Sequence, residues 1–245
     1  MTRVLITGVG GPTPLGIAKS LKLAYKDIQL VGVDADRFAP GLYRPEIFDK
    51  TYQVPLASDN AYWDYLQKIV DTEQIDYAFV VPEREVLTWA KRKASNKLPC
   101  ESLIPPQSIA EFLYDKFLVS EALAPLKLVP DTVRLTETEE KEGQILAIGQ
   151  RLGYPYWIRA AKGAGALGAF KIKAEADLRS WLNMNPAASD LIASTFLPGR
   201  NYACKVLFNE GEVVMTAVGE RIAYLLAAAA PSGISGMCAR GRLLN

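Results

Sequence analysis

The sequence predicts an α/β domain over residues 1–114 followed by an α+β domain over residues 115–245. Strand and helix patterns alternate in the first domain, which is the order typical of a parallel sheet. In the second domain several strand patterns follow one another directly, as in antiparallel sheets. The chain has 245 residues and 49% of them are hydrophobic, which is enough to build the cores of two modest domains.

The first domain opens with a βαβ unit. Residues 3–7 are mostly apolar or β-branched, so we expect a buried strand there, followed by a glycine-rich turn over residues 8–16. A helical pattern then continues to about Tyr25, and a second strand over residues 28–33 ends at Asp34. An acidic residue at the end of the second strand is typical of a Rossmann-like unit.

The rest of the first domain continues this alternation. We expect strands over residues 50–54, 76–81 and 103–104, and helices over residues 58–70 and 85–96. Ser58 or Asp59 could cap the first of these helices. The doublet Pro105-Pro106 stops the last strand because proline has no backbone N–H to donate. We place the domain boundary near Tyr114.

The second domain mixes helices with consecutive strands. Helices are expected over residues 115–124 and 138–152, with an extended segment over residues 129–133 between them. A predicted hairpin has strands over residues 156–160 and 169–173, joined by a loop of glycine and alanine. The remaining elements are a helix around Leu178, Trp181 and Leu182, three antiparallel strands over residues 191–196, 202–208 and 212–218, and a helical turn over residues 227–230.

Composition excludes several classes of partner. The 28 basic and 27 acidic residues give a net charge of +1, so we predict neither a nucleic acid nor an anionic membrane as partner. No apolar run approaches the roughly 20 residues that span a bilayer, and the N-terminal run is too short for a signal peptide, so we expect a cytoplasmic protein. Cys100, Cys204 and Cys238 are too widely spaced for a zinc knuckle or a disulfide framework, so we expect reduced thiols.

The chain contains no histidine. This excludes an imidazole base, a Ser-His-Asp triad and a histidine-bound metal. The remaining chemistry must use lysine, arginine, carboxylates and backbone amides. These groups suit phosphate, because cations and oriented N–H groups stabilise phosphoryl oxygens without proton transfer.

The glycine-rich turn over residues 8–16 has two interpretations. It could bind a dinucleotide, with Asp34 as the partner of the ribose. However, its spacing is not a clean GxGxxG, and Pro12 and Pro14 remove two N–H donors that a phosphate cradle would use. We therefore favour a tight structural turn or a vestigial site, with Asp34 as a solvated acid at the end of a strand.

A second glycine cluster, over residues 153–169, is more informative. It places Arg159 at the end of a predicted strand and follows it with a loop that contains Gly163, Gly165 and Gly168. A loop with many accessible amides can fold over a triphosphate while the strand holds the cation beneath it. A structural salt bridge is the alternative role for Arg159, since a buried guanidinium needs a partner.

This run resembles the ATP-grasp superfamily, whose members carry a strand of the form P-x-x-[KR]-P before a glycine-rich loop. The carbamoyl-phosphate synthase branch has arginine where this chain has Arg159, although Ala160 replaces the usual proline. Three further segments resemble the family in the same order along the chain: the D-K motif at Tyr114-Asp115-Lys116, the P-x-T motif within residues 128–132, and the hinge at residues 196–202. Thr195 and Asn201 stand where the hinge of the family is acidic.

The resemblance implies roles for individual residues. Lys116 and Arg159 would neutralise phosphate charge, although Lys116 could instead be an ordinary surface lysine. The loop over residues 163–168 would close over the nucleotide. The implied nucleotide-binding residues are Lys116, Arg159, Gly163, Gly165, Gly168, Phe196, Leu197 and Asn201, and the implied carboxylate-binding residues are Arg221, Ser232 and Gly233. Arg159 and Arg221 would serve catalysis.

The implied activity is that of an ATP-dependent carboxylate-amine ligase, similar to carbamoyl-phosphate synthase, which acts through an acylphosphate. Its cofactors would be ATP and Mg²⁺, and its partners a small carboxylate and an amine, with a homo-oligomer also compatible. The family's acidic metal-binding strand is not found before Asn245, so we expect a truncated and inactive ATP-grasp domain with metal ligands beyond this residue. The alternatives are an NAD(P)-dependent oxidoreductase on the first βαβ unit and a nucleotide-binding pseudoenzyme.

Overall fold

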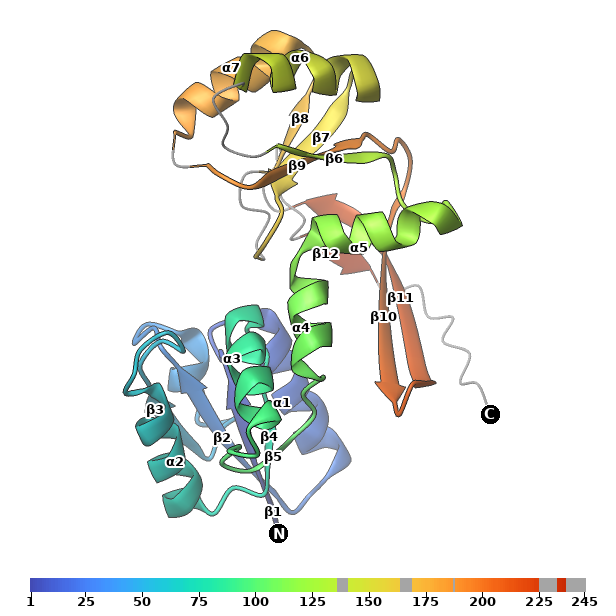
Figure 1. The fold of residues 1–245 in the computed structure, drawn as a ribbon. Coiled ribbons are helices and arrows are strands. Elements are labelled where there is room, and N and C mark those ends of the chain that lie inside the picture. The colour runs from blue at the N-terminus through green and yellow to red at the C-terminus, as the bar shows by residue number, and fades with distance from the viewer. Residues whose placement is uncertain (136–140, 164–168, 187, 225–232, 237–245) are drawn as a thin grey trace. The chain divides into compact units, whose positions relative to one another are not determined.

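The computed structural model describes residues 1–135, 141–163, 169–186, 188–224 and 233–236. The chain divides into two compact units, Met1–Tyr114 and Asp115–Asn245 (Figure 1). Each unit has its own hydrophobic core and is described by itself.

A five-stranded parallel sheet forms the centre of the first unit. Its order is β3-β2-β1-β4-β5, so the direction of winding reverses between β1 and β4. The strands are β1 (Thr2–Thr7), β2 (Ile28–Asp34), β3 (Lys50–Gln53), β4 (Tyr77–Phe79) and β5 (Glu101–Ser102). This architecture confirms the predicted α/β class of the N-terminal half.

Helices cover both faces of this sheet. They are α1 (Pro12–Ala24), α2 (Tyr62–Glu73), α3 (Glu83–Ala94) and α4 (Gln107–Tyr114), with a short 3-10 helix over Pro40–Tyr43. Successive residues of β1 point to opposite faces. Val4 therefore packs with Ala18 of α1, whereas Leu5 packs with Leu66 of α2 and Trp89 of α3.

Two predictions for the first unit are wrong in detail. The last strand lies at Glu101–Ser102 instead of residues 103–104, because parallel pairing with β4 sets its position, while Ile104 is a buried core residue. Helix α2 begins at Tyr62 without a side-chain cap. Asp59 instead accepts a hydrogen bond from the Ala61 amide at 2.8 Å, in the turn before the helix.

The second unit contains a four-stranded antiparallel sheet in the order β6-β9-β7-β8. Its strands are β6 (Thr132–Leu135), β7 (Tyr156–Ala160), β8 (Phe170–Ile172) and β9 (Leu191–Thr195). Helices α6 (Lys141–Leu152) and α7 (Glu175–Met184) cover one face and form the core with it (Figure 1). Helix α5 (Lys116–Leu123) packs against β6, and a short 3-10 helix, Ala124–Leu126, follows it.

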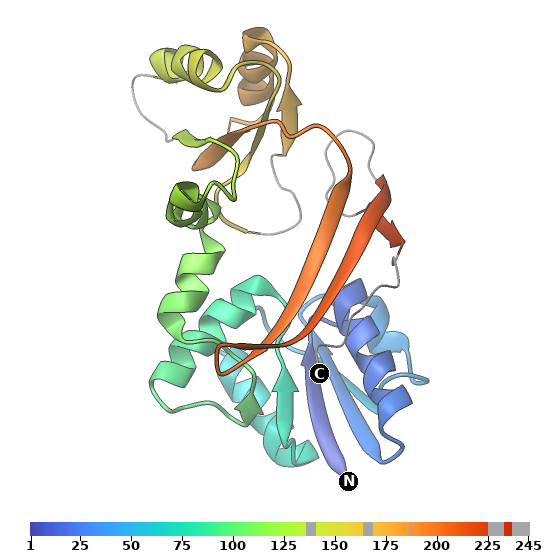
Figure 2. The ribbon, with the colours of Figure 1, turned by 90° about the vertical axis from the view of Figure 1, so that its right-hand side faces the viewer.

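A separate three-stranded antiparallel sheet completes the second unit. It consists of β10 (Asn201–Asn209), β11 (Glu212–Tyr224) and β12 (Gly233–Gly236), and Figure 2 shows β10 and β11 as a long hairpin. The extended segment predicted over residues 129–133 forms a strand only from Thr132 onward, where pairing with β9 begins. The helical turn predicted over residues 227–230 lies outside the described residues.

Two observations concern the expected location and redox state. Among the described residues, no helix combines the length and the apolar character needed to cross a membrane. Cys100 and Cys204 are free thiols, while Cys238 lies outside the described residues.

Candidate functional site

Strand β7 places Arg159 on the face of the sheet opposite helices α6 and α7. Tyr156 and Ile158 are buried in the core beneath these helices. Because neighbouring side chains of a strand point to opposite faces, Trp157 and Arg159 face the other way. Cross-strand pairing places Lys171 of β8 beside Trp157 on that same face. We call this surface of β7, β8 and β9 the open face.

Arg159 is half-buried on the open face, and no carboxylate of the described residues forms an ion pair with it. Its Nε atom is buried without a hydrogen-bond partner among the residues that the structure describes. Burial lowers the pKa of the guanidinium from its ordinary value, although arginine stays charged in proteins. A buried donor without a partner costs about 1–3 kcal/mol, so the site favours an anion. The described residues provide no salt bridge that would give Arg159 a structural role.

Lys116 lies at the base of the glycine loop. Asp115 caps helix α5 by accepting a hydrogen bond from the Phe117 amide at 3.0 Å. The Lys116 amide donates to the carbonyl of Ala161 at 2.9 Å, and its ammonium group donates to the carbonyl of Gly163. Lys116 is thus a half-buried residue whose ammonium group is bound to the segment that follows β7.

The hinge residues follow β9. Phe196 is half-buried, and the Lys171 Nζ atom lies 3.8 Å from the centre of its ring. Leu197 is exposed, and Asn201 is the exposed first residue of β10. The sequence interpretation missed Lys171. The available signal was the alternation within the predicted hairpin, which puts Lys171 opposite Trp157 and on the side of Arg159.

Several predicted residues are described only in part. Arg221 lies in β11, where its backbone pairs with Asn201 on one side and Ser235 on the other. Gly233 is the first residue of β12 and pairs with Tyr224. Gly165, Gly168 and Ser232 lie outside the described residues.

A charged cluster adjoins Lys116 and was not predicted. Arg134 of β6 makes a bidentate ion pair with Asp190, with distances of 2.6 and 2.7 Å, and also donates to Asp115 at 3.2 Å. The Lys162 Nζ atom lies 3.6 Å from Asp115 and 3.7 Å from Asp190. These four residues, called the Asp115 cluster below, come from four separate segments, so no local motif could have revealed that they lie together.

The glycine turn of the first unit uses its amides within the protein. The amides of Val9 and Gly11 donate to the carbonyls of Val33 and Gly8, at 3.3 and 3.1 Å. The Gly10 amide donates to Asp34 at 2.7 Å, and the other oxygen of Asp34 accepts from the Asp36 amide at 2.9 Å. Asp34 therefore holds the turn together. It is neither the merely solvated acid that we favoured nor free for a ribose.

The turn also leaves little room for other side chains. Gly8 has a φ of +68°, and a Cβ atom there would lie 2.4 Å from the ring of Pro82. Glu85 lies on α3 close by and is buried, and this burial raises the pKa of its carboxyl to about 7. Its Oε2 atom has no hydrogen-bond partner among the described residues. Glu85 is thus a buried titratable residue that the sequence interpretation missed.

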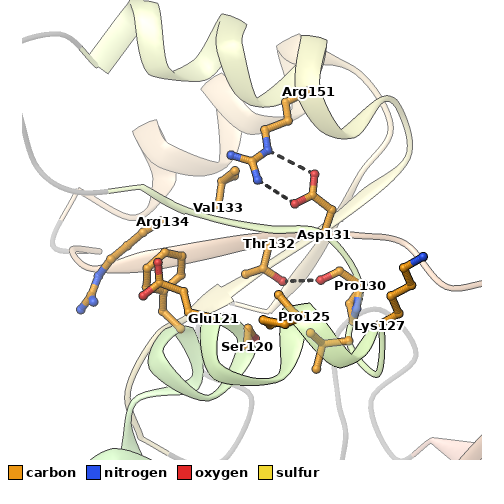
Figure 3. Close-up of a pocket in the computed structure, with 13 residues that line it drawn as sticks. Ser120, Glu121, Pro125, Lys127, Pro130, Asp131, Thr132, Val133, Arg134 and Arg151 are labelled. Carbon is orange, nitrogen blue, oxygen red and sulfur yellow. Dashed lines mark hydrogen bonds and ion pairs between the residues drawn. The ribbon is translucent and has the colours of Figure 1, made fainter.

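A pocket of about 830 Å³ lies between helix α5 and strand β6 (Figure 3). Its lining includes Pro130, Asp131 and Thr132 of the P-x-T motif, but none of the predicted site residues. Asp131 forms a bidentate ion pair with Arg151 at 2.7 and 3.1 Å, and the Thr132 hydroxyl donates to the Pro130 carbonyl at 3.0 Å. The motif therefore has a structural role in this chain.

The described residues do not form a metal site. They contain no group of three or more cysteine, aspartate or glutamate side chains that could hold a metal ion. Glu220 is paired with Arg200, and Asp115 and Asp190 are paired with Arg134. The carboxylates of the described residues thus do not fit the oxygen-rich shell that Mg²⁺ prefers.

No protein-family model and no curated protein matches the sequence. Solved structures do match. N5-carboxyaminoimidazole synthetase from Staphylococcus aureus, complexed with ADP, is 17% identical with a TM-score of 0.64, and the match covers 90% of this chain and 54% of that one. The biotin carboxylase domain of 2-oxoglutarate carboxylase from Hydrogenobacter thermophilus is 14% identical with a TM-score of 0.63, over 91% of this chain and 50% of that one.

A third match is the D-alanine-D-alanine ligase from Coxiella burnetii, which is 17% identical with a TM-score of 0.61, over 91% of this chain and 71% of that one. The chain thus spans about half the length of the first two proteins. At these identities the likeness concerns the fold, and it extends over both units of the chain.

Proposed function

Because the chain has the fold of the ATP-grasp superfamily, we propose that it binds ATP on the open face and belongs to an ATP-dependent carboxylate-amine ligase. The observation that carries the proposal is Arg159, a half-buried cation without an anionic partner among the described residues. Lys116 lies at the loop that follows the same strand, and Lys171 shares the open face. Three cations around a sheet surface suit a polyphosphate.

The roles of the remaining residues belong to the same proposal. Phe196 and Leu197 would lie against adenine, and Asn201 would lie near the ribose. Gly163, Gly165 and Gly168 would offer backbone amides to the phosphates. Arg221, Ser232 and Gly233 would bind the carboxylate substrate.

The proposed reaction has two steps. A carboxylate oxygen attacks the γ-phosphorus of ATP, and the bond from this phosphorus to the bridging oxygen breaks, which releases ADP and leaves an acylphosphate. The amine then attacks the acyl carbon, phosphate departs with the electrons of the carbon–oxygen bond, and the amine loses a proton. Arg159 and Lys116 would stabilise the charge that shifts onto the phosphoryl oxygens in the first step.

Magnesium would supply further charge neutralisation for the phosphates. Since the described carboxylates do not fit a metal, we assign no ligand to them and no step to the metal. The arginine at position 159 supports the finer proposal of a ligase similar to carbamoyl-phosphate synthase. An arginine at this position also fits other ATP-grasp ligases, because its contact with phosphate does not depend on which carboxylate is the substrate.

Known structures support the choice of nucleotide and partners. The synthetase from Staphylococcus aureus was crystallised with ADP, and the biotin carboxylase domain, a dimer, with MgADP and bicarbonate. These ligands support ATP as the nucleotide and a small carboxylate as a partner, and the dimer supports a homo-oligomer. The oxidoreductase alternative is disfavoured because the amides of Val9, Gly10 and Gly11 donate within the protein.

Calorimetric titration with ATP, ADP and NADH tests the proposal. We expect ATP and ADP to bind and NADH not to bind. ADP release in the presence of a panel of carboxylates and amines then separates a ligase from a nucleotide-binding pseudoenzyme. Binding of NADH without binding of ATP would contradict the proposal and favour the oxidoreductase.

A further inference from the structure

The Asp115 cluster connects the segments that carry the proposed phosphate-binding groups. Asp115 directly precedes Lys116, and Lys162 directly precedes Gly163. Asp115 and Lys162 also form an isolated antiparallel bridge. The cluster therefore lies at the point where helix α5 meets the base of the glycine loop.

Backbone hydrogen bonds extend the connection from Asp190 to Lys116. The carbonyl of Asp190 accepts from the Ala161 amide at 2.9 Å, and the carbonyl of Ala161 accepts from the Lys116 amide at 2.9 Å. Arg134 closes the ring through the side chains, because it binds both Asp190 and Asp115. Four segments of the chain are thus held in one closed circuit.

The backbone of Asp190 is in a conformation that needs support. Its φ is +55°, in the left-handed region that most residues avoid, although aspartate tolerates it better than others. The bidentate pair with Arg134 holds the residue there, and the planar guanidinium fork gives this pair a defined geometry. The position of the Asp190 carbonyl, and hence of Ala161, follows from this pair.

The cluster also neutralises the positive charge of Arg134, which lies in the same row of the sheet as Arg159. Arg134 and Arg159 both pair with Ile192, so they lie in one row on the same face. Because two strand spacings separate them, their Cα atoms are roughly 10 Å apart. Arg134 is neutralised by two carboxylates, whereas Arg159 has no partner among the described residues. Two arginines in the same row thus have different roles.

We infer that Asp115, Arg134 and Asp190 are positioning residues that set Lys116 and the base of the glycine loop for phosphate. This inference rests on the proposed function, and it makes a prediction opposite to that of simple electrostatics. Removing a negative charge near an anion site should strengthen the binding of ATP through Coulomb attraction. Loss of positioning should weaken it.

The central variant is Asp190→Asn, because asparagine also tolerates a positive φ while it removes the charge and one acceptor. We expect its ATP dissociation constant to rise about tenfold, which corresponds to a loss of about 1.4 kcal/mol of binding free energy. We also expect hydrogen exchange at the Lys116 and Ala161 amides to become at least about tenfold faster. Arg134→Lys keeps the charge but loses the fork, and should give a partial effect of the same sign.

The matched control is Asp131→Asn, which breaks the bidentate pair with Arg151 on the far side of β6. This variant should leave ATP affinity and amide exchange at Lys116 within about twofold of the parent chain. A double-mutant cycle with Lys116→Met tests the route of the effect. In the Lys116→Met background, Asp190→Asn should cost much less than it does alone, because the residue that it positions is gone.

Two results would overturn the inference. One is unchanged or tighter ATP binding by Asp190→Asn while Lys116→Met weakens it. The other is unchanged exchange at the Lys116 and Ala161 amides. The exchange measurement uses no nucleotide, so it decides on the cluster even if the parent chain binds no ATP, which would count against the proposed function instead.

Discussion

Arg159→Met should stabilise the free protein and weaken its binding of ATP. Arg159 keeps a buried Nε donor without a hydrogen-bond partner among the described residues, and burial disfavours its charge. Methionine keeps an unbranched stem of similar reach and carries neither the donor nor the charge. The substitution therefore removes a cost in the free state and a contact in the bound state.

The structure allows both effects to be estimated. A buried donor without a partner costs about 1–3 kcal/mol, and because Arg159 is only half-buried we expect the lower end, about 1 kcal/mol of added stability. A hydrogen bond to a charged group contributes about 1.5–3 kcal/mol. Its loss should weaken ATP binding by roughly 10- to 100-fold.

The assay combines thermal unfolding with calorimetry. Without nucleotide the variant should melt a few degrees above the parent chain, and ATP should raise its melting temperature less than it raises that of the parent. Arg134→Met is the matched control, since it removes an arginine from the same row that is fully paired. It should destabilise the protein because it leaves two carboxylates without their partner.

Two results together would refute this reasoning: a free energy of unfolding of Arg159→Met that is lower than that of the parent by about 1 kcal/mol or more, and an unchanged affinity for ATP. Arg159 would then be a structural cation whose partner lies outside the described residues. Arg159→Lys should restore part of the affinity for ATP, because an ammonium group keeps the charge without the bidentate fork.

Three further predictions concern other groups. The raised pKa of Glu85, about 7 against an unfolded value of 4.5, means that the folded state binds this proton more tightly, so stability should fall as pH rises from about 4.5 through 7. Glu85→Gln should remove up to about 3 kcal/mol of this decline in urea unfolding measured at pH 5 and pH 8.5, and parallel curves for the two proteins would contradict the prediction. Asp34→Ala removes the acceptor of the Gly10 and Asp36 amides, so it should lower the free energy of unfolding by about 1–2 kcal/mol without affecting ATP affinity, and unchanged stability would show that these bonds contribute nothing. Lys171→Met should weaken ATP binding about tenfold, because it removes a cation from the open face. Lys173→Met, at an exposed position just beyond β8, should change ATP binding less than about twofold, and equal effects of the two variants would show that Lys171 has no specific role in binding ATP.

Local patterns predicted most elements of the fold. Strand β7 was predicted with its observed ends, because the buried pair Tyr156 and Ile158 alternates with Trp157 and Arg159. A helix was predicted over residues 115–124 and is observed as α5, although its cap at Asp115 was not predicted. The prediction failed for β5, whose residues Glu101 and Ser102 have low strand propensity and are a strand only because β4 pairs with them.

The sequence by itself predicted the two fold classes, excluded imidazole chemistry, and placed a run of glycines shortly after a strand that carries a cation near its end. Tertiary structure alone decided which cations are paired. Arg134 and Arg159 look alike in the sequence, yet Asp115 and Asp190 neutralise one and leave the other. The physical reason is that charge pairing depends on distances of a few ångströms between segments far apart in the chain, and only the cross-strand register sets those distances.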